Sequence, residues 1–91
     1  LTMKAEKKFD RMPFAVSRPG DSPEMILAIR ALEVANVEIR RPENNPYQLK
    51  ASPTVSFYPS KGTIYVDGDP APLSCRGVDA LLNYLGQHIS I

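Results

Sequence analysis

The chain holds one cysteine and one histidine among its 91 residues, and this scarcity excludes several kinds of site. Cys75 has no partner for an internal disulfide and fits a reducing compartment, so we expect a cytoplasmic protein. One cysteine and one histidine cannot build a tetrahedral zinc site in a monomer. The sequence "DGD" at 67–69 lacks the further ligands of a calcium loop. We therefore expect no metal ion.

Glycine-rich loops and long apolar runs are absent as well. The five glycines are scattered singly, so no phosphate-binding loop follows a predicted strand, and we expect no cofactor. The longest near-apolar run, residues 25–29, is far shorter than the roughly 20 residues that a membrane-spanning helix needs. The N-terminus has positive charge but no apolar segment. We therefore expect neither a secretory signal nor a membrane partner, with Met3 as the natural start.

A nucleophilic enzyme is not expected either. Cys75 falls at the start of a predicted helix, a position where a thiol can be activated. His88, the single imidazole, lies thirteen residues further along nearly the same helix. At 1.5 Å per residue this separation is roughly 20 Å, too far for the two side chains to meet within one subunit. We therefore expect a protein that binds rather than catalyses.

Basic residues are unevenly placed along the chain. The first 20 residues carry a net charge of +3, and the remaining 71 carry −2. We interpret residues 1–21 as a basic, partly flexible arm and residues 22–91 as one α+β domain. The arm either contacts an anion such as nucleic acid or only keeps the protein soluble. Its candidate contact residues are Lys4, Lys7, Lys8 and Arg11.

Two segments have helical patterns. In "DSPEMILAIRALEVAN", residues 21–36, Ser22 can cap a helix and Pro23 suits its first turn. The apolar stripe consists of Met25, Ala28, Ile29, Leu32 and Ala35, with Leu27, Ala31 and Val34 beside it. In "SCRGVDALLNYLGQH", residues 74–88, Ser74 is the predicted cap and Gly86 the end. The stripe of this second helix is Val78, Leu81, Leu82 and Leu85.

Between the helices, alternation predicts three or four short strands. Residues 36–41 and 47–51 alternate, with Tyr47 on the same side as Leu49, and an edge strand near residues 14–16 is a further candidate. The hairpin "TVSFYPSKGTIYVDG", residues 54–68, has the strongest pattern. With residues 59–62 as its loop, the register pairs Tyr58 with Thr63, Phe57 with Ile64 and Val55 with Val66.

The element order predicts an α+β fold. We expect a two-layer helix-β-β-β(-β)-helix domain whose antiparallel sheet is covered by two helices on one face. The inner sheet face is predicted to hold Val37, Ile39, Leu49, Val55, Phe57, Ile64 and Val66. The outer face is predicted to show Arg40, Gln48, Lys50, Ser56, Tyr58, Thr63 and Tyr65. So small a core is also compatible with a homodimer that buries further apolar surface.

The outer face allows three interpretations. Tyrosine rings are stacking platforms and nearby cations can meet phosphates, the combination that single-strand binders use. Tyrosine is equally favoured in strands for packing alone. Tyrosine and arginine are also enriched in protein interfaces. For a nucleic acid or a partner protein, the candidate contact residues around the sheet are Arg40, Lys50, Tyr58, Lys61 and Tyr65.

The helix-β-β-β-helix order resembles the double-stranded-RNA-binding-domain fold, by element order alone. Where that family has a basic run, "SCRGVDA" offers only Arg76 beside Asp79, and the family's Gly-Pro-x-His loop is absent, so no binding residue is carried over. "FYPSKGTIYVDG" followed by "RGVDALLNYL" is similar to a hairpin-plus-helix in short uncharacterised phage and prophage proteins, over residues 54–85. This likeness implies a mobile-element origin, where small proteins bind nucleic acid or block host machinery.

We therefore predict a small binding protein without enzymatic activity. Nucleic-acid binding through the arm and the outer sheet face is the first hypothesis. The alternative is a protein-interaction module, such as a phage-encoded inhibitor of a host protein. That module would use the tyrosines or the surplus apolar side of the first helix.

Overall fold

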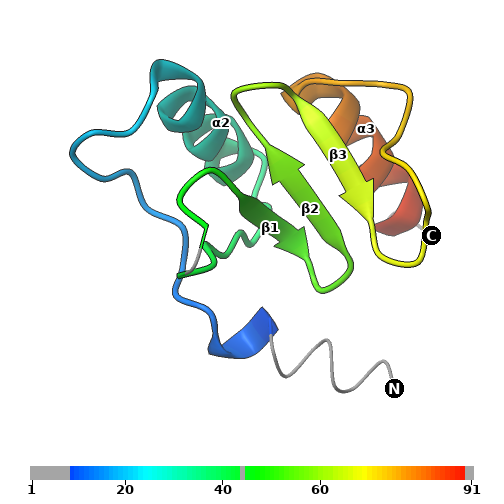
Figure 1. The fold of residues 1–91 in the computed structure, drawn as a ribbon, viewed down its shortest axis with the longest axis horizontal. Coiled ribbons are helices and arrows are strands. Elements are labelled where there is room, and N and C mark those ends of the chain that lie inside the picture. Colours follow the sequence, from blue (N-terminus) through cyan, green and yellow to red (C-terminus); the bar gives the residue numbers. More distant parts are fainter. Residues whose placement is uncertain (1–8, 44, 90–91) are drawn as a thin grey trace.

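The computed structural model describes residues 9–43 and 45–89, and Figure 1 shows its ribbon. A helical turn at residues 9–11 comes first. The elements that follow are α2 (Pro23–Val34), β1 (Leu49–Ser52), β2 (Val55–Tyr58), β3 (Thr63–Val66) and α3 (Val78–Ile89). The strands form an antiparallel three-stranded sheet in the order β1-β2-β3. The predicted α+β class is confirmed.

The β2–β3 hairpin has the predicted register. The paired residues are Val55 with Val66, Ser56 with Tyr65, Phe57 with Ile64 and Tyr58 with Thr63. In the loop, the N–H groups of Lys61 and Gly62 both donate to the Tyr58 carbonyl, at 3.2 and 2.8 Å. Gly62 has a φ of +70°, a backbone conformation that a Cβ makes unfavourable. Alternation and loop length were sufficient to predict this element because a one-residue slip would move every apolar side chain to the wrong face.

Two further segments predicted as strands are reduced to isolated β-bridges. Arg40 bridges Lys50 of β1 on one side and Phe14 on the other. Arg40 and Lys50 exchange two backbone hydrogen bonds, at 2.9 and 2.8 Å. Pro13 and Pro42 stand next to these bridges and have no N–H to donate, which explains why no longer ladder forms there.

Helix α2 begins where the sequence predicts. The Ser22 hydroxyl accepts a hydrogen bond from the Met25 N–H at 3.1 Å, and a proline follows the cap. The buried stripe of the helix is Met25, Ala28, Ile29 and Leu32. Leu27 and Val34 are 62% and 82% exposed, so the apolar positions beside the stripe point away from the core.

Helix α3 begins later than predicted, at Val78 rather than after Ser74. The segment before it follows the edge of β3, where the N–H of Leu73 donates to the Ile64 carbonyl at 2.9 Å. This pairing competes with helix formation because it commits the backbone to an extended path. Gly77, with a φ of +97°, then turns the chain into the helix.

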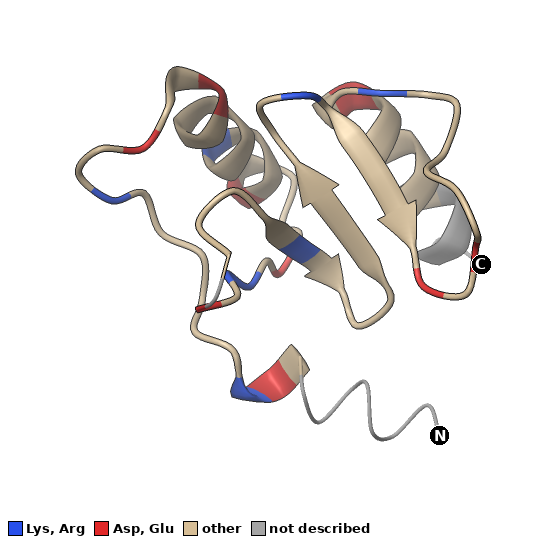
Figure 2. Ribbon diagram, viewed as in Figure 1, with Lys and Arg blue, Asp and Glu red and all other residues tan. Residues whose placement is uncertain are grey.

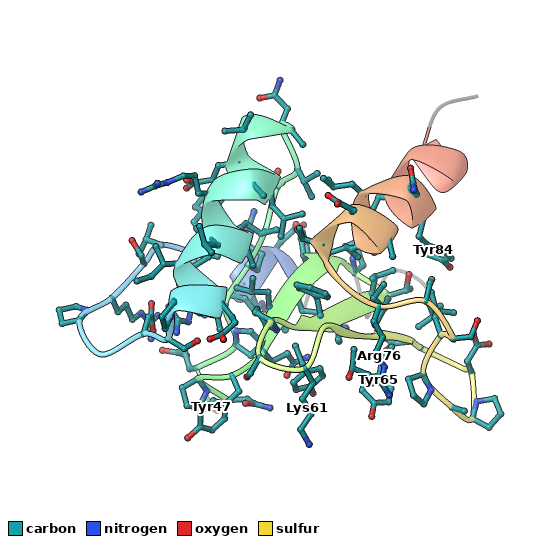
Figure 3. All side chains as sticks on the ribbon, turned by 90° about the horizontal axis from the view of Figure 1, so that it is seen from above. Tyr47, Lys61, Tyr65, Arg76 and Tyr84 are labelled. Carbon is teal, nitrogen blue, oxygen red and sulfur yellow. The ribbon has the colours of Figure 1, made fainter. Side chains whose placement is uncertain are left out.

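The core lies between the sheet and the two helices, which are on the same side of the sheet in Figure 3. Its members are Ala15, Met25, Ala28, Ile29, Leu32, Ile39, Leu49, Ala51, Val55, Phe57, Ile64, Leu81 and Leu85. The strand residues among them share one sheet face, as the register requires. Neither described helix combines the length and the apolar character that crossing a membrane requires.

A buried ion pair ties the chain before α2 to the segment after it. Arg41 is only 2% exposed, and its two terminal nitrogens donate to the Asp21 carboxylate at 2.8 and 2.6 Å. They also donate to the carbonyls of Val16 and Pro46, at 3.0 and 3.1 Å. The paired hydrogen bonds from Arg41 lower the pKa of Asp21 to about 2 and raise the pKa of Arg41 above its ordinary value. Residues before α2 and residues after it thus converge on one guanidinium.

Candidate binding surface

The predicted basic arm is only partly described. Three of its predicted contact residues lie outside the described residues: Lys4, Lys7 and Lys8. Arg11 is exposed in the helical turn at residues 9–11. Phe9 and Ala15 are only 6% and 4% exposed, so this stretch packs on the domain. Within the predicted arm, residues 9 and 15 are thus buried against the domain.

Arg40, predicted on the open face, is engaged by the fold. It is 8% exposed, and one terminal nitrogen donates to the carbonyls of Asp10 and Met12 at 3.0 and 2.9 Å. The other terminal nitrogen pairs with the Glu38 carboxylate. The guanidinium carbon stands 4.0 Å from the centre of the Phe14 ring, a cation–π contact. Because these contacts hold the N-terminal segment against the sheet, we leave Arg40 out of the candidate surface.

Lys50 is also engaged by its own neighbours. Its side chain is 12% exposed, and Nζ lies 3.3 Å from the Pro53 carbonyl and 3.6 Å from the Asp67 carboxylate. Ser56, which pairs with Lys50 across β1 and β2, is 5% exposed, and its hydroxyl accepts a hydrogen bond from the Gln48 amide at 2.9 Å. On the β1 side of the outer face, these internally paired side chains border a hollow of about 590 Å³, whose lining includes Arg11 and Lys50 together with the acidic residues Glu43 and Asp67.

Tyr58 and Tyr65 meet on the outer face as a diagonal cross-strand pair. Their ring centroids are 5.6 Å apart and the ring planes are inclined by 82°, an edge-to-face contact. Tyr65 is 43% exposed, while Tyr58 is half-buried. The half-buried Tyr58 ring therefore supports the Tyr65 ring, and the exposed surface of Tyr65 is open to a ligand.

A third tyrosine joins this pair, contrary to the sequence-based prediction. Alternation places Tyr47 on the inner side with Leu49, but Tyr47 is 67% exposed and lines the same hollow as Tyr58 and Tyr65. Strand β1 begins only at Leu49, and Tyr47 lies in a turn where its N–H donates to the Asn45 side chain at 3.1 Å. The prediction for Tyr47 is wrong because a turn breaks the two-residue alternation of a strand.

The three tyrosines line a hollow of about 580 Å³ on the outer face. Its complete described lining, which we call the tyrosine surface, is Asn45, Tyr47, Tyr58, Ser60, Lys61, Thr63 and Tyr65. Lys61 is exposed in the β2–β3 loop and is the one charged residue among these. Thr63, predicted on this face, is only 8% exposed. Aromatic rings beside a cation suit a flat ligand that carries negative charge.

Arg76 adds a second cation close to this surface. The N–H of Gly77 donates to the Gly62 carbonyl at 2.8 Å, so the segment before α3 lies against the loop that carries Lys61. Arg76 itself is exposed. Figure 3 shows four side chains on the side of the sheet away from both helices: Tyr47, Lys61, Tyr65 and Arg76. Sequence reasoning missed Arg76 because the contact joins two loops, and no spacing along the chain signals it.

Two of the described basic segments lie at opposite ends of the sheet. Figure 2 shows the helical turn at residues 9–11 near the end where β1 leads into β2. The basic positions of the β2–β3 loop and of the segment before α3 are at the other end. Arg11 and Lys61 are therefore separated by the length of the strands. Both were predicted from the sequence as parts of one contact set.

A second hollow, of about 740 Å³, lies beside β1 and the end of α3. Its lining is mainly apolar and includes Val37, Ala51, Leu82 and Leu85. Among the described residues, no group of three or more histidine, cysteine or acidic side chains is placed to hold a metal ion. The second hollow thus joins residues of the core and its margin rather than the residues predicted as contacts.

The tyrosine surface is the feature on which a functional assignment can be built. Its rings come from the turn before β1, from β2 and from β3, and its lysine comes from the β2–β3 loop, which touches the segment that carries Arg76. Compared with known proteins, the chain matches no family model, no curated protein and no solved structure.

Proposed function

We propose that this protein binds nucleic acid through the tyrosine surface. The observation that carries the proposal is a hollow on the outer sheet face that three tyrosines and one lysine line, with no acidic residue among its described lining residues, whereas the hollow on the β1 side includes Glu43 and Asp67. Bases stack on aromatic side chains, and a neighbouring cation meets the phosphate. The residues assigned to the site are Tyr47, Tyr58, Lys61 and Tyr65.

The exposed rings have the form that stacking needs. Tyr47 and Tyr65 are 67% and 43% exposed, so a base can reach them without any rearrangement of the core. The edge-to-face contact with Tyr58 restrains the Tyr65 ring before a ligand arrives. A restrained side chain loses less conformational entropy on binding, which favours affinity.

The basic arm is a separate contribution to the proposed binding. Lys4, Lys7 and Lys8 are predicted to add affinity that depends on salt and not on sequence. Arg11 lies at the far end of the strands from the hairpin loop, so the arm and the tyrosine surface contact different parts of a bound strand. The site on the sheet does not depend on the arm.

Fluorescence anisotropy with labelled mixed-sequence DNA and RNA oligonucleotides, at low and high salt, tests the proposal. We expect the protein to bind, and to bind more tightly at low salt. Tyr65→Ala is expected to weaken binding by roughly 1–3 kcal/mol, the usual contribution of one stacked base. Tyr65→Phe keeps the ring and is expected to retain most of the affinity. Asn83→Ala, which shortens an exposed uncharged side chain on α3, is the control.

Two results would contradict this assignment. If the wild-type protein binds no oligonucleotide even at low salt, the proposed function is wrong. If Tyr65→Ala binds as well as the wild type, the site is not on the tyrosine surface. Far-ultraviolet circular dichroism of each variant ensures that a loss of binding is not a loss of fold.

One observation favours a second candidate, self-association through α2. Leu27 and Val34 are two helical turns apart, so they lie on the same side of the helix, and they are 62% and 82% exposed. An apolar helix side of this kind can pack against a second copy of the chain. Light scattering over a range of protein concentrations measures the mass directly. A homodimer predicts twice the monomer mass and its loss in Leu27→Glu, whereas a constant monomer mass contradicts it.

A further inference from the structure

The segment between β3 and α3 is fixed against the edge of the sheet. The N–H of Leu73 donates to the Ile64 carbonyl at 2.9 Å, and the N–H of Gly77 donates to the Gly62 carbonyl at 2.8 Å. Arg76 lies between these two anchors, directly before Gly77. Its backbone position is therefore set by the hairpin rather than by the helix that follows.

Two glycines allow the hairpin loop and this segment to touch. A Cβ on Gly62 would lie 2.9 Å from the Gly77 nitrogen and 3.5 Å from the Arg76 Cβ. The φ angles of Gly62 and Gly77 are +70° and +97°, which other residues rarely adopt. The close approach places Arg76 beside the loop that carries Lys61. A larger residue at position 62 would separate them.

Both cations are available to a ligand. Lys61 and Arg76 are exposed, and neither side chain makes a hydrogen bond or an ion pair with any other described residue. Asp79, in the first turn of α3, is close to Arg76 along the chain but forms no ion pair with it. Figure 3 shows both cations on the same side of the sheet as Tyr65. This edge of the tyrosine surface is therefore positively charged.

The form of the surface distinguishes single-stranded from duplex nucleic acid. A base in a duplex is already stacked on both of its sides, so a tyrosine ring on a sheet can stack only on a base that has left the stack. Reading a duplex through its grooves requires a protruding helix or β-ribbon, whereas the tyrosines line a hollow. Stacking on Tyr47 and Tyr65 is thus restricted to unpaired bases.

We infer that the ligand is a single strand whose bases stack on Tyr65 and its neighbouring rings and whose phosphates contact Lys61 and Arg76. This inference rests on the proposed function and adds to it the strandedness of the ligand and a contact residue, Arg76. For single strands, each phosphate contact contributes about −0.7 to the slope of log K against log salt concentration. The two cations together should contribute about −1.4.

The test is anisotropy of the full chain with three labelled probes of one mixed sequence: single-stranded DNA, single-stranded RNA and duplex DNA. Probes of roughly 12 nucleotides cover the site sizes of small single-strand binders. We expect both single strands to bind at least about tenfold more tightly than the duplex at the same salt concentration, because only they can stack on the rings. Lys61→Ala and Arg76→Ala should each flatten the salt slope by about 0.7, while the exposed α2 control Arg30→Ala leaves the slope unchanged.

The outcomes separate this inference from the proposed function. Equal binding of duplex and single strand overturns the inference but leaves nucleic-acid binding in place. Single-strand binding with an unchanged salt slope in Arg76→Ala overturns the assignment of Arg76. If no probe binds, both the inference and the proposed function are wrong. A difference in affinity between the single-stranded DNA and RNA probes identifies which single strand is preferred.

Discussion

Arg40 and Arg41 are neighbours in the chain, yet they serve different parts of the structure. Because successive side chains of an extended segment point to opposite faces, Arg40 faces the outer side and Arg41 the inner side. Arg41 pairs with Asp21, twenty residues earlier, and Arg40 reaches carbonyls near residue 10. Alternation predicted the outward direction of Arg40, but the partners of both side chains are set by tertiary packing, which no local pattern contains. For this reason Arg40 was predicted as a contact residue and is found engaged by the fold.

The buried pair makes a specific prediction for stability. Asp21→Ala leaves the Arg41 guanidinium buried without a counter-charge, and we expect it to lower the free energy of unfolding by about 3 kcal/mol. Urea denaturation measures the change. Glu33→Ala, which removes an exposed acidic side chain from α2, is the matched control and should change stability by less than about 0.5 kcal/mol. Equal losses in the two variants would show that the pair contributes nothing.

The same pair predicts a pH dependence. The pKa of Asp21 is lowered from 3.8 to about 2 by its hydrogen bonds with Arg41, so the ionised carboxylate favours the folded state. This stabilisation is fully present above pH 3.8 and is lost as the pH falls from there towards 2. The stability difference between the wild type and Asp21→Ala should therefore be constant near neutrality and shrink over that acidic range. A difference that does not change with pH would contradict the assigned ion pair.

At the scale of the elements, the sequence predicted what depends on local patterns. The β2–β3 register and the start of α2 were predicted correctly, because alternation, loop length and a Ser-Pro cap are all local signals. The start of α3 was not, because the segment before it pairs with the edge of β3. Tyr47 was misplaced for a related reason, since a turn at residues 46–47 interrupts the expected strand.

The contact between the hairpin loop and the segment before α3 can be tested with glycine variants. Gly62→Ala adds a Cβ 2.9 Å from the Gly77 backbone in a left-handed conformation, whereas Gly68→Ala has a positive φ but nothing within 4 Å. In both variants, a Cβ at positive φ should lower the free energy of unfolding by about 1–2 kcal/mol. Gly62→Ala should lower it by at least about 1 kcal/mol more, because the backbone of Gly77 must move away from the new Cβ. Urea denaturation of both variants measures the difference. Equal losses would mean that the two loops do not touch.

At the scale of the whole molecule, the open sheet face was predicted and its composition was not. The hairpin register placed Tyr58 and Tyr65 on the outer face, as the structure has them. On the β1 side of that face, Arg40 and Lys50 are engaged by their own neighbours. Near the β2–β3 loop, Tyr47 and Arg76 are added to the face, both from loops. A sequence pattern identifies the face of a strand but not which loops fold onto it.

Amide chemical-shift mapping locates a bound nucleic acid on the protein and so tests whether the ligand lies on the tyrosine surface. A single-stranded oligonucleotide is added at low salt to the isotope-labelled protein, and the shift of each amide signal is followed. We expect the largest changes at Asn45, at Tyr47, at Tyr58 and at residues 60–65 and 76–77, with little change along α2. Changes concentrated on α2, or no changes at all, would contradict the proposed site.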